Sequence, residues 1–281
     1  MRFFLIGYPL GHSMSPFLHG MFLDQIKEQG TYELKEMAPD TFNDQIRALK
    51  QSDYLGFNIT IPYKVDIIPF LDAIDPQAKA IGAVNTVVIK DGSWTGYNTD
   101  GAGYVQSFKY HYPQLFHPSS RLLVLGAGGA SRGIVHALNN ETCAAITISN
   151  RTVEKATTII NSLPPKKDYQ AISFSEAEAT LDQYDGVINT TSLGMEPNVE
   201  TQAIHLDRLK RGTVVSDIVY KPFVTALLSE AKSKGANIHH GHEMLVYQAA
   251  LAFKLWTGYE VDARPVIEAF EAKVNYPPLK R

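Results

Sequence analysis

The stretch "RLLVLGAGGASRGIVHALN", Arg121 to Asn139, decides the fold that this sequence predicts. Its aliphatic start is typical of a buried strand and its end of a helix. The turn between them contains three glycines, Gly126, Gly128 and Gly129. Backbone at such a turn can approach a pyrophosphate closely, and a helix beginning at Ala130 would point its first N–H groups at that anion. The stretch therefore favours a dinucleotide site.

Strand and helix patterns continue to alternate from this turn to about residue 240. Strand segments include "AAITISN" (Ala144 to Asn150), "YDGVINTT" (Tyr184 to Thr191) and "TVVSDIV" (Thr213 to Val219). This alternation is typical of a doubly wound parallel sheet, so we expect an α/β protein with a Rossmann-type dinucleotide-binding domain. Ser131 stands where the usual third glycine would fall, so we expect the helix to sit slightly differently against its strand.

The residues after the next strand indicate which dinucleotide is bound. An NAD site usually has an acid there, which takes the ribose hydroxyls. Here Asn150 has no charge to repel a 2′-phosphate, and Arg151 can grip one with its planar guanidinium. Lys155, one helical turn later, can add a second cation, although long cations are mostly ordinary surface residues. The sequence therefore favours NADP as the cofactor.

The first hundred residues contain a separate set of strands and helices. "RFFLIG" (Arg2 to Gly7) predicts a strand, and the next segment predicts a helix opened by Ser15 and Pro16 and closed by Gly30. Further strands are expected at "YELKEMA" (Tyr32 to Ala38) and "YLGFNITI" (Tyr54 to Ile61).

The pair Asp91-Gly92, between two β-rich runs, is a strong signal for a two-residue hairpin turn. Such a turn pairs Lys90 with Ser93, and counting outward brings the polar residues at the far ends of both strands together. The polar residues concerned are Asn85, Thr86, Asn98, Thr99 and Asp100.

Two apolar helices close the sequence, at 243–258 and 263–274, and their faces need a partner. We expect the chain to cross back to the first half at about residue 240. This gives an N-terminal α/β domain of residues 1–100 plus 240–281, and an NADP-binding Rossmann domain of residues 101–239.

Lys64 stands just past the strand that ends at Ile61 and Pro62. Most lysines in such a place cover apolar surface with the stem and keep the ammonium in water.

Composition excludes several functional classes. The formal net charge is −3 and the isoelectric point about 6.3, which is no signature of a polyanion-binding protein, so we expect no nucleic-acid partner. No apolar run approaches the roughly 20 residues that span a bilayer, so we expect no membrane partner. Cys143 is the only cysteine, which fits a reducing cytoplasm.

Several motifs together resemble one family, shikimate dehydrogenase, and the resemblance covers almost the whole chain. The motifs are "GYPLGHSMSPFLH" (Gly7 to His19), "NITIPYK" (Asn58 to Lys64), "GAVNT" (Gly82 to Thr86), "GYNTDGAG" (Gly96 to Gly103), "GAGGASR" (Gly126 to Arg132), "NRT" (Asn150 to Thr152), "NTTSLGM" (Asn189 to Met195), "DIVYKP" (Asp217 to Pro222) and "MLVYQAALAFKLWTG" (Met244 to Gly258). The resemblance implies NADPH-dependent reduction of 3-dehydroshikimate to shikimate.

The resemblance also implies roles for individual residues. The N-terminal domain would be the substrate-binding catalytic domain, and Lys64 and Asp100 would form the catalytic pair. A ketone that receives a hydride becomes an alkoxide, which needs a proton and a nearby positive charge, and Lys64 as an ammonium would supply both. Asp100 would orient the lysine and favour its ammonium form. The substrate-binding residues would be Ser13, Ser15, Thr60, Asn85, Tyr220 and Gln248, with the two serines on the carboxylate. The serine that precedes Pro16 could also be a helix cap. The further cofactor contacts would be Ala127, Ala130, Thr152, Thr190, Ser192, Met195, Ile218 and Gly241.

Three alternatives stay open. The first is a paralogue that acts on quinate, or one that accepts NAD, and the second is a non-catalytic NADP-binding sensor. The third is a metal site at "HHGHE" (His239 to Glu243), which has no ligand spacing typical of a metal and no use in hydride transfer, so we expect no metal. For His12 and His19 we expect structural roles. The protein is expected to be a monomer or a homodimer.

Overall fold

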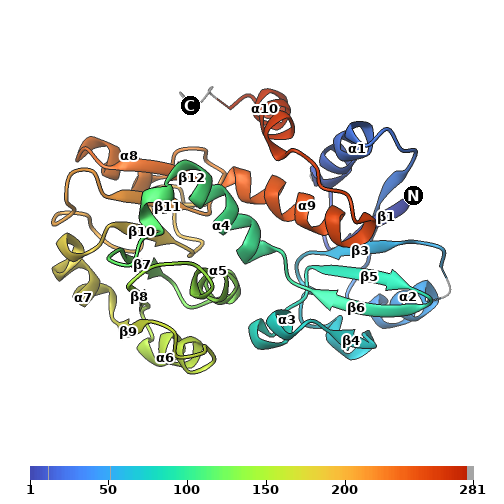
Figure 1. The fold of residues 1–281 in the computed structure, drawn as a ribbon, viewed down its shortest axis with the longest axis horizontal. Helices are drawn as coiled ribbons and strands as arrows, with labels where there is room; N and C mark the ends of the chain where they lie inside the picture. The colour runs from blue at the N-terminus through green and yellow to red at the C-terminus, as the bar shows by residue number, and fades with distance from the viewer. Residues whose placement is uncertain (12, 51, 277–281) are drawn as a thin grey trace. The chain divides into compact units, whose positions relative to one another are not determined.

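The structure is a computed structural model, and it describes residues 1–11, 13–50 and 52–276, so the expectation for His12 lies outside the described residues. The chain divides into two compact units, Met1–Thr99 with Val246–Arg281, and Asp100–Leu245. Figure 1 labels their helices and strands along the chain from blue to red. Among the described residues, no helix has both the length and the apolar character needed to cross a membrane.

The first unit is built on a six-stranded mixed sheet in the order β2-β1-β3-β5-β6-β4. Its strands are β1 (Arg2–Gly7), β2 (Thr31–Glu36), β3 (Gly56–Ile59), β4 (Ala73–Ile74), β5 (Thr86–Lys90) and β6 (Ser93–Tyr97). Its helices are α1 (Ser15–Gln25), α2 (Phe42–Leu49), α3 (Pro76–Ile81) and α10 (Ala263–Lys273). Helix α9 (His242–Thr257) starts in the second unit and ends in the first.

Alternation along β1 explains how this sheet is covered on both faces. Phe4 packs in a cluster with α2 and β3, and its ring stacks on Phe57 at 4.7 Å. Phe3 points to the other face, where its ring stacks on Trp256 of α9 at 4.7 Å. The indole N–H of Trp256 donates to the carbonyl oxygen of Val87 at 2.8 Å. Helix α9 thus packs against an apolar face of β1 and buries Phe3.

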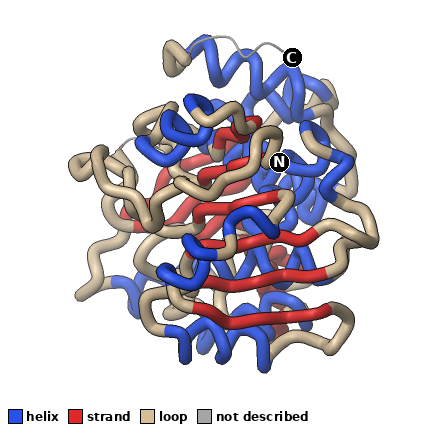
Figure 2. Tube along the Cα trace, turned by 90° about the vertical axis from the view of Figure 1, so that its left-hand side faces the viewer, coloured by secondary structure: helices blue, strands red, loops and turns tan. Residues whose placement is uncertain are grey.

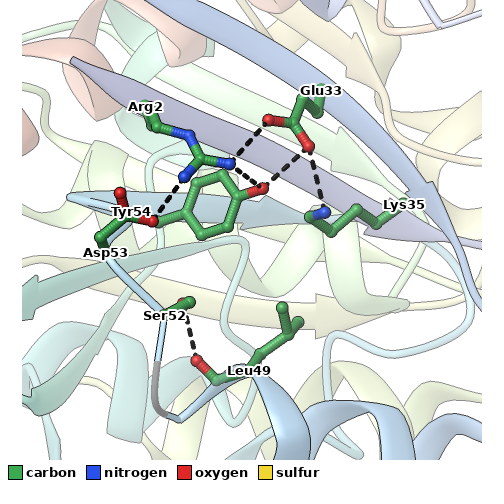
Figure 3. Close-up of polar contacts among 7 residues, drawn as sticks. All are labelled: Arg2, Glu33, Lys35, Leu49, Ser52, Asp53 and Tyr54. Carbon is green, nitrogen blue, oxygen red and sulfur yellow. Dashed lines mark hydrogen bonds and ion pairs between the residues drawn. The ribbon is translucent and has the colours of Figure 1, made fainter.

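A cross-strand polar cluster joins β1 and β2 to the loop before β3 (Figure 3). Arg2 forms ion pairs with Asp53 and with Glu33, and its guanidinium lies 4.4 Å from the centre of the Tyr54 ring. The Tyr54 hydroxyl and the Lys35 ammonium both donate to Glu33. Charged side chains of this kind on an edge strand discourage pairing with another chain.

The first helix ends earlier than the sequence predicts. The sequence predicts a helix that reaches Gly30, but α1 ends at Gln25. Lys27 takes the left-handed conformation (φ 56°), and its backbone N–H donates to the carbonyl oxygen of Asp24. The backbone N–H of Glu28 donates to the carbonyl oxygen of Leu23, and these two bonds make a Schellman ending. Gly30 serves another purpose, because a Cβ there would lie 2.7 Å from the carbonyl oxygen of Met1.

The second unit is a Rossmann-type domain, with a parallel sheet in the order β12-β11-β10-β7-β8-β9. The strands are β7 (Arg121–Leu125), β8 (Ala145–Ser149), β9 (Asp168–Ile172), β10 (Gly186–Asn189), β11 (Val214–Asp217) and β12 (Asn237–His240). The helices are α4 (Asp100–His111), α5 (Gly129–Asn139), α6 (Val153–Asn161), α7 (Phe174–Ala179) and α8 (Ala226–Ser233). Figure 2 shows these strands (red) side by side in one sheet with helices (blue) around it.

Both faces of this sheet are buried, as the aliphatic strands predict. Leu122 and Val124 belong to a cluster with α4, α5 and α6, whereas Leu123 and Leu125 belong to one with α7 and α8. The sheet order reverses between β7 and β10. In such sheets ligands bind outside the carboxyl ends of the strands at this reversal.

Candidate active site

Most of the predicted substrate-binding residues lie along one edge of the first sheet, the edge that is formed by the ends of its strands. Strands β1 and β3 run parallel and end side by side, whereas β5 is antiparallel to β3 and begins at that same edge. Strand β6 ends opposite the start of β5, with Thr86 paired to Tyr97. The segments that leave or enter this edge carry Ser13, Ser15, Thr60, Lys64, Asn85 and Thr99.

A network of short hydrogen bonds fixes the amide of Asn85 at this edge. Asn85 is buried, and its Oδ1 accepts from the Thr99 N–H at 2.8 Å and from the Thr86 hydroxyl at 2.9 Å. Its Nδ2 donates to the Thr99 hydroxyl at 2.9 Å and lies 3.4 Å from Oε1 of Gln248. The two amides that were predicted to contact substrate, Asn85 and Gln248, therefore lie together in one unit.

Asn58 also belongs to this network, although it is not among the site residues predicted from the sequence. It is buried at the end of β3, and its Nδ2 donates to the Thr86 hydroxyl and to the Asn85 carbonyl at 3.0 and 3.1 Å. Its Oδ1 accepts from the Tyr32 hydroxyl at 2.7 Å. An amide inside an otherwise apolar strand needs such partners, and this was the signal available in the sequence.

Lys64 lies in the turn that follows β3 and is partly buried. Its carbonyl oxygen accepts from the Val84 N–H at 2.8 Å, which ties this turn to the segment entering Asn85. Thr60 lies between β3 and Lys64, and its N–H donates to the carbonyl oxygen of Ile6 at 2.9 Å. The backbone therefore holds the position of the lysine relative to the amide network.

The two serines lie at the start of α1, but neither caps it as the sequence suggested for Ser15. The residue before the helix is Met14, and Ser15 is the first helical residue. Ser15 is almost fully buried, and its N–H donates to Oγ of Ser13 at 3.3 Å. Pro16 is therefore the second helical residue, one place later than the first position that proline usually takes. Nearby His19 is buried and stacks on Tyr32 at 4.3 Å, which is a packing role.

Asp100 opens α4 and belongs to the second unit. Its neighbour Gly101 is packed so tightly that a Cβ there would lie 2.0 Å from the carbonyl oxygen of Gly133 in α5. Only glycine permits this approach of one helix backbone to another. Within this unit the start of α4 is thereby fixed against the helix that follows the glycine turn.

The glycine turn has the geometry that an anion site requires. Gly126 has φ +105°, and a Cβ would lie 2.8 Å from Oγ1 of Thr190, so this glycine is needed by the fold itself. At Gly128 and Gly129 a Cβ would meet no atom within 4 Å. Because neither residue has a side chain, the space in front of the first turn of α5 is open. Gly128 stands at the N-cap, so no side chain caps the helix there. A pyrophosphate fits this arrangement.

The structure changes two details of this turn. Helix α5 begins at Gly129, one residue before the expected Ala130, with Ala127 in the turn before it. Ser131 is buried and its hydroxyl donates to the carbonyl oxygen of Gly126 at 2.7 Å. The serine that replaces the usual third glycine therefore braces the turn.

The end of β8 presents the residues predicted to select NADP. Asn150 donates through its side chain to the Thr152 carbonyl at 2.8 Å, and Thr152 precedes the first residue of α6. Arg151 and Lys155 are exposed, and neither has an ion-pair partner among the described residues. Both cations are therefore available to a ligand at this strand end.

The loops after β10 and β11 carry most of the other predicted cofactor residues, and Gly241 follows β12. Thr190 is buried and its hydroxyl donates to the Leu125 carbonyl at 2.7 Å, which ties the loop after β10 to the glycine turn. Exposed residues in these loops are Ser192, Met195 and Tyr220, while Ile218 is partly buried. Gly241 is needed for close packing, because a Cβ would lie 2.4 Å from the carbonyl oxygen of Ile218.

Two of the three histidines of "HHGHE", His239 and His240, lie within hydrogen-bonding distance of neighbouring groups. The two ring nitrogens of His239 lie 2.9 Å from the Ser107 hydroxyl and 2.8 Å from the Ser216 hydroxyl. Burial lowers the pKa of His239 to about 3. Nδ1 of His240 lies 2.8 Å from the carbonyl oxygen of Phe223. The sequence motif is thus built into hydrogen bonds of the second unit.

Comparison with known proteins places the chain among dehydrogenases. Three family models match: "Shikimate dehydrogenase substrate binding domain" at residues 5–87, "Shikimate / quinate 5-dehydrogenase" at 114–220 and "Shikimate 5'-dehydrogenase C-terminal domain" at 241–269. A shikimate dehydrogenase (NADP(+)) of Oceanobacillus iheyensis is 51% identical over 92% of both chains.

Solved structures give the same result. Shikimate 5-dehydrogenase from Thermus thermophilus, in complex with NADP(H) and shikimate, has a TM-score of 0.83 at 30% identity and covers 96% of this chain and 98% of its own. Quinate dehydrogenase from Corynebacterium glutamicum, in complex with NAD, has a TM-score of 0.86 at 28% identity and covers 97% and 99%. On these matches the chain belongs to the shikimate dehydrogenase family.

Proposed function

We propose that the chain catalyses the reversible reduction of 3-dehydroshikimate to shikimate with NADPH. The observation that carries the proposal is the polar edge of the first sheet. There, hydroxyl and amide side chains suited to a polyhydroxylated ring acid lie on segments beside Lys64. The matches to NADP-dependent shikimate dehydrogenases support the same activity. The first unit then binds substrate and the second binds NADP.

The chemistry divides between a lysine and an aspartate. NADPH, when bound, supplies the hydride for the ketone carbon. Lys64, as an ammonium, stabilises the developing alkoxide and donates the proton that makes it a hydroxyl. Asp100 accepts a hydrogen bond from the neighbouring substrate hydroxyl and orients the lysine. Reversal of these steps oxidises shikimate, with Lys64 taking the proton.

The remaining side chains orient the two ligands. Ser13 and Ser15 bind the substrate carboxylate, with Tyr220 nearby. Thr60, Asn85 and Gln248 bind the ring hydroxyls, and the tight network around Asn85 supports this because it fixes the direction of the amide.

The cofactor contacts follow the second sheet. The glycine turn and the start of α5 bind the pyrophosphate, which the open space at Gly128 and Gly129 supports. Arg151, with Asn150, Thr152 and Lys155, binds the 2′-phosphate. The loops after β10 and β11, with Thr190, Ser192, Met195 and Ile218, take the other half of the dinucleotide, together with Gly241 after β12.

A quinate dehydrogenase is the second candidate, because a solved structure of that name has a similar fold. Two serines in the carboxylate loop, Ser13 and Ser15, favour shikimate over quinate. A non-catalytic NADP sensor is disfavoured, since such a protein has no use for Lys64 together with Asp100. Initial rates with shikimate and with quinate, each with NADP+ and with NAD+, test the assignment. A clear preference for quinate would overturn it.

The role of the lysine has its own test. Lys64→Ala is expected to lower turnover by on the order of a hundredfold or more and to change substrate affinity only slightly. Lys79→Ala, an exposed lysine in α3, is the matched control and should retain full activity. Unchanged turnover in Lys64→Ala would remove this lysine from the mechanism. A cytoplasmic location and a monomeric or dimeric state stay predictions.

A further inference from the structure

Asp217 is a fully buried acid at the end of β11 that no catalytic or cofactor role so far uses. Its Oδ1 accepts from Nδ2 of Asn189 at 3.0 Å and from the N–H of Val219 at 2.9 Å. Its Oδ2 accepts from the Thr225 hydroxyl at 2.7 Å. One carboxyl group therefore receives three hydrogen bonds from three different segments.

These three segments belong to the two loops that leave the strand ends. Asn189 is the last residue of β10, and its Oδ1 accepts from the N–H and the hydroxyl of Thr191 at 3.1 and 2.8 Å. Val219 is the second residue of the loop after β11, and Thr225 ends this loop as the N-cap of α8. The loop after β10 and the loop after β11 also meet directly, because the Glu196 N–H donates to the carbonyl oxygen of Lys221 at 3.3 Å.

Burying an acid at this point is costly, so its presence needs a physical reason. Burial raises the pKa of Asp217 to about 6, although three donors oppose the shift. An apolar residue in the same space would avoid this cost but could not hold the polar backbone of two loops. The loop after β10 is also unusually long, since no strand or helix of the structure occurs between β10 and β11.

We propose that Asp217 is a positioning residue for the nicotinamide half of NADP. The proposal rests on the proposed function and deepens its cofactor site. A Rossmann domain has two mononucleotide-binding halves, and Arg151 at the end of β8 lies in the half that takes the adenosine. Strands β10 and β11 belong to the other half. Through Asn189 and Val219, Asp217 sets the loops that present Thr190, Met195 and Ile218 to the reacting ring.

The inference is tested by comparing a whole cofactor with one half of it. NADP+ occupies both halves of the site, whereas 2′,5′-ADP carries only the adenosine with its 2′-phosphate. For Asp217→Ala we expect NADP+ to bind about tenfold more weakly and 2′,5′-ADP to bind within twofold of the unchanged protein, both measured by calorimetry. Asp217→Asn retains an acceptor and lets the Thr225 hydroxyl accept instead, so it should restore NADP+ binding to within about threefold.

Asp185→Ala is the matched control, because Asp185 accepts a backbone N–H from Arg121 at 2.9 Å where the strands of the same sheet begin, far from their carboxyl ends. It should leave NADP+ binding unchanged whatever it does to stability. If Asp217→Ala fails to fold, Thr225→Val removes one of the three donors and should weaken NADP+ binding alone by about threefold.

Three results would overturn the inference: equal weakening of NADP+ and 2′,5′-ADP, no rescue by Asp217→Asn, or weakening of NADP+ by Asp185→Ala. The ratio of the two affinities needs no substrate. The positioning role is therefore judged separately from the proposed function. The proposed function would be refuted instead if the unchanged protein failed to reduce 3-dehydroshikimate.

Discussion

Removing the guanidinium of Arg151 is expected to change which dinucleotide the protein uses while leaving its fold intact. Arg151 is exposed at the end of β8 and has no ion-pair partner among the described residues. Arg151→Ala therefore breaks no ion pair of the folded chain, and we expect an unchanged thermal midpoint. The whole cost should appear when a 2′-phosphate is bound.

The magnitude follows from a charge-assisted hydrogen bond to a phosphate, worth about 1.5–3 kcal/mol. At about 1.4 kcal/mol per tenfold, this is a loss of roughly ten- to a hundredfold in kcat/KM for NADP+. Because the site is exposed, salt screens the contact, and the lower end applies at physiological ionic strength. NAD+ has no 2′-phosphate, so its kcat/KM should stay almost constant.

Steady-state rates of shikimate oxidation with each cofactor, at low and at raised salt, measure this effect. Asn150→Asp should go further than Arg151→Ala, because a carboxylate repels the phosphate and offers a partner to the NAD ribose. Lys155→Ala should show a smaller loss with NADP+. Equal losses with both cofactors in Arg151→Ala, or unchanged protein that already uses NAD+ as well as NADP+, would refute the reasoning.

Three further outcomes are expected. Gly101→Ala places a methyl group 2.0 Å from the Gly133 carbonyl oxygen, so the thermal midpoint should fall and turnover drop at least tenfold, as roughly 1 Å of displacement at Asp100 would cause. Full turnover would contradict the fixed start of α4. Gly128→Ala meets no atom within 4 Å, so its midpoint should stay constant while NADP+ binds about tenfold more weakly in a titration; unaltered binding would argue against a pyrophosphate there. Burial lowers the pKa of His19 to about 3, so below about pH 6.5 the unfolded chain binds a proton that the folded one excludes. As the pH is lowered from 6 to 4, this residue should therefore reduce the free energy of unfolding by about 1.4 kcal/mol per pH unit. Urea unfolding of His19→Phe should show a free energy of unfolding that depends less steeply on pH.

Much of the fold could be predicted because its signals are local. The Asp91-Gly92 pair predicts a hairpin turn, and both residues have positive φ (51° and 76°) with Lys90 paired to Ser93. Aliphatic strands around a glycine turn likewise predict the parallel sheet. The polar end of the hairpin follows from counting along two strands, and the bonds of Asn85 to Thr99 confirm that these residues meet.

The rest depends on contacts between distant segments. The end of α1 is decided by Lys27, whose left-handed conformation no sequence rule favours over the nearby Gly30. Asn58 is visible as a polar residue in a strand, but its partner Tyr32 comes from another strand. Asp217 is hardest to foresee, because its role arises where the ends of two parallel strands converge and no spacing along the chain encodes that meeting.

The insertion of one unit within the other also sets an order of events during synthesis. Residues 100–245 form a compact unit that is complete before the segment from Val246 onward is made. The first 99 residues wait longer, since the partner of Phe3 is Trp256 and arrives only with α9. Domains usually fold from the N-terminus as they leave the ribosome. In this chain the middle unit can therefore fold first. The N-terminal residues keep an apolar strand face exposed until the final tenth or so of the chain is made. Chaperones have most reason to bind this face during that period.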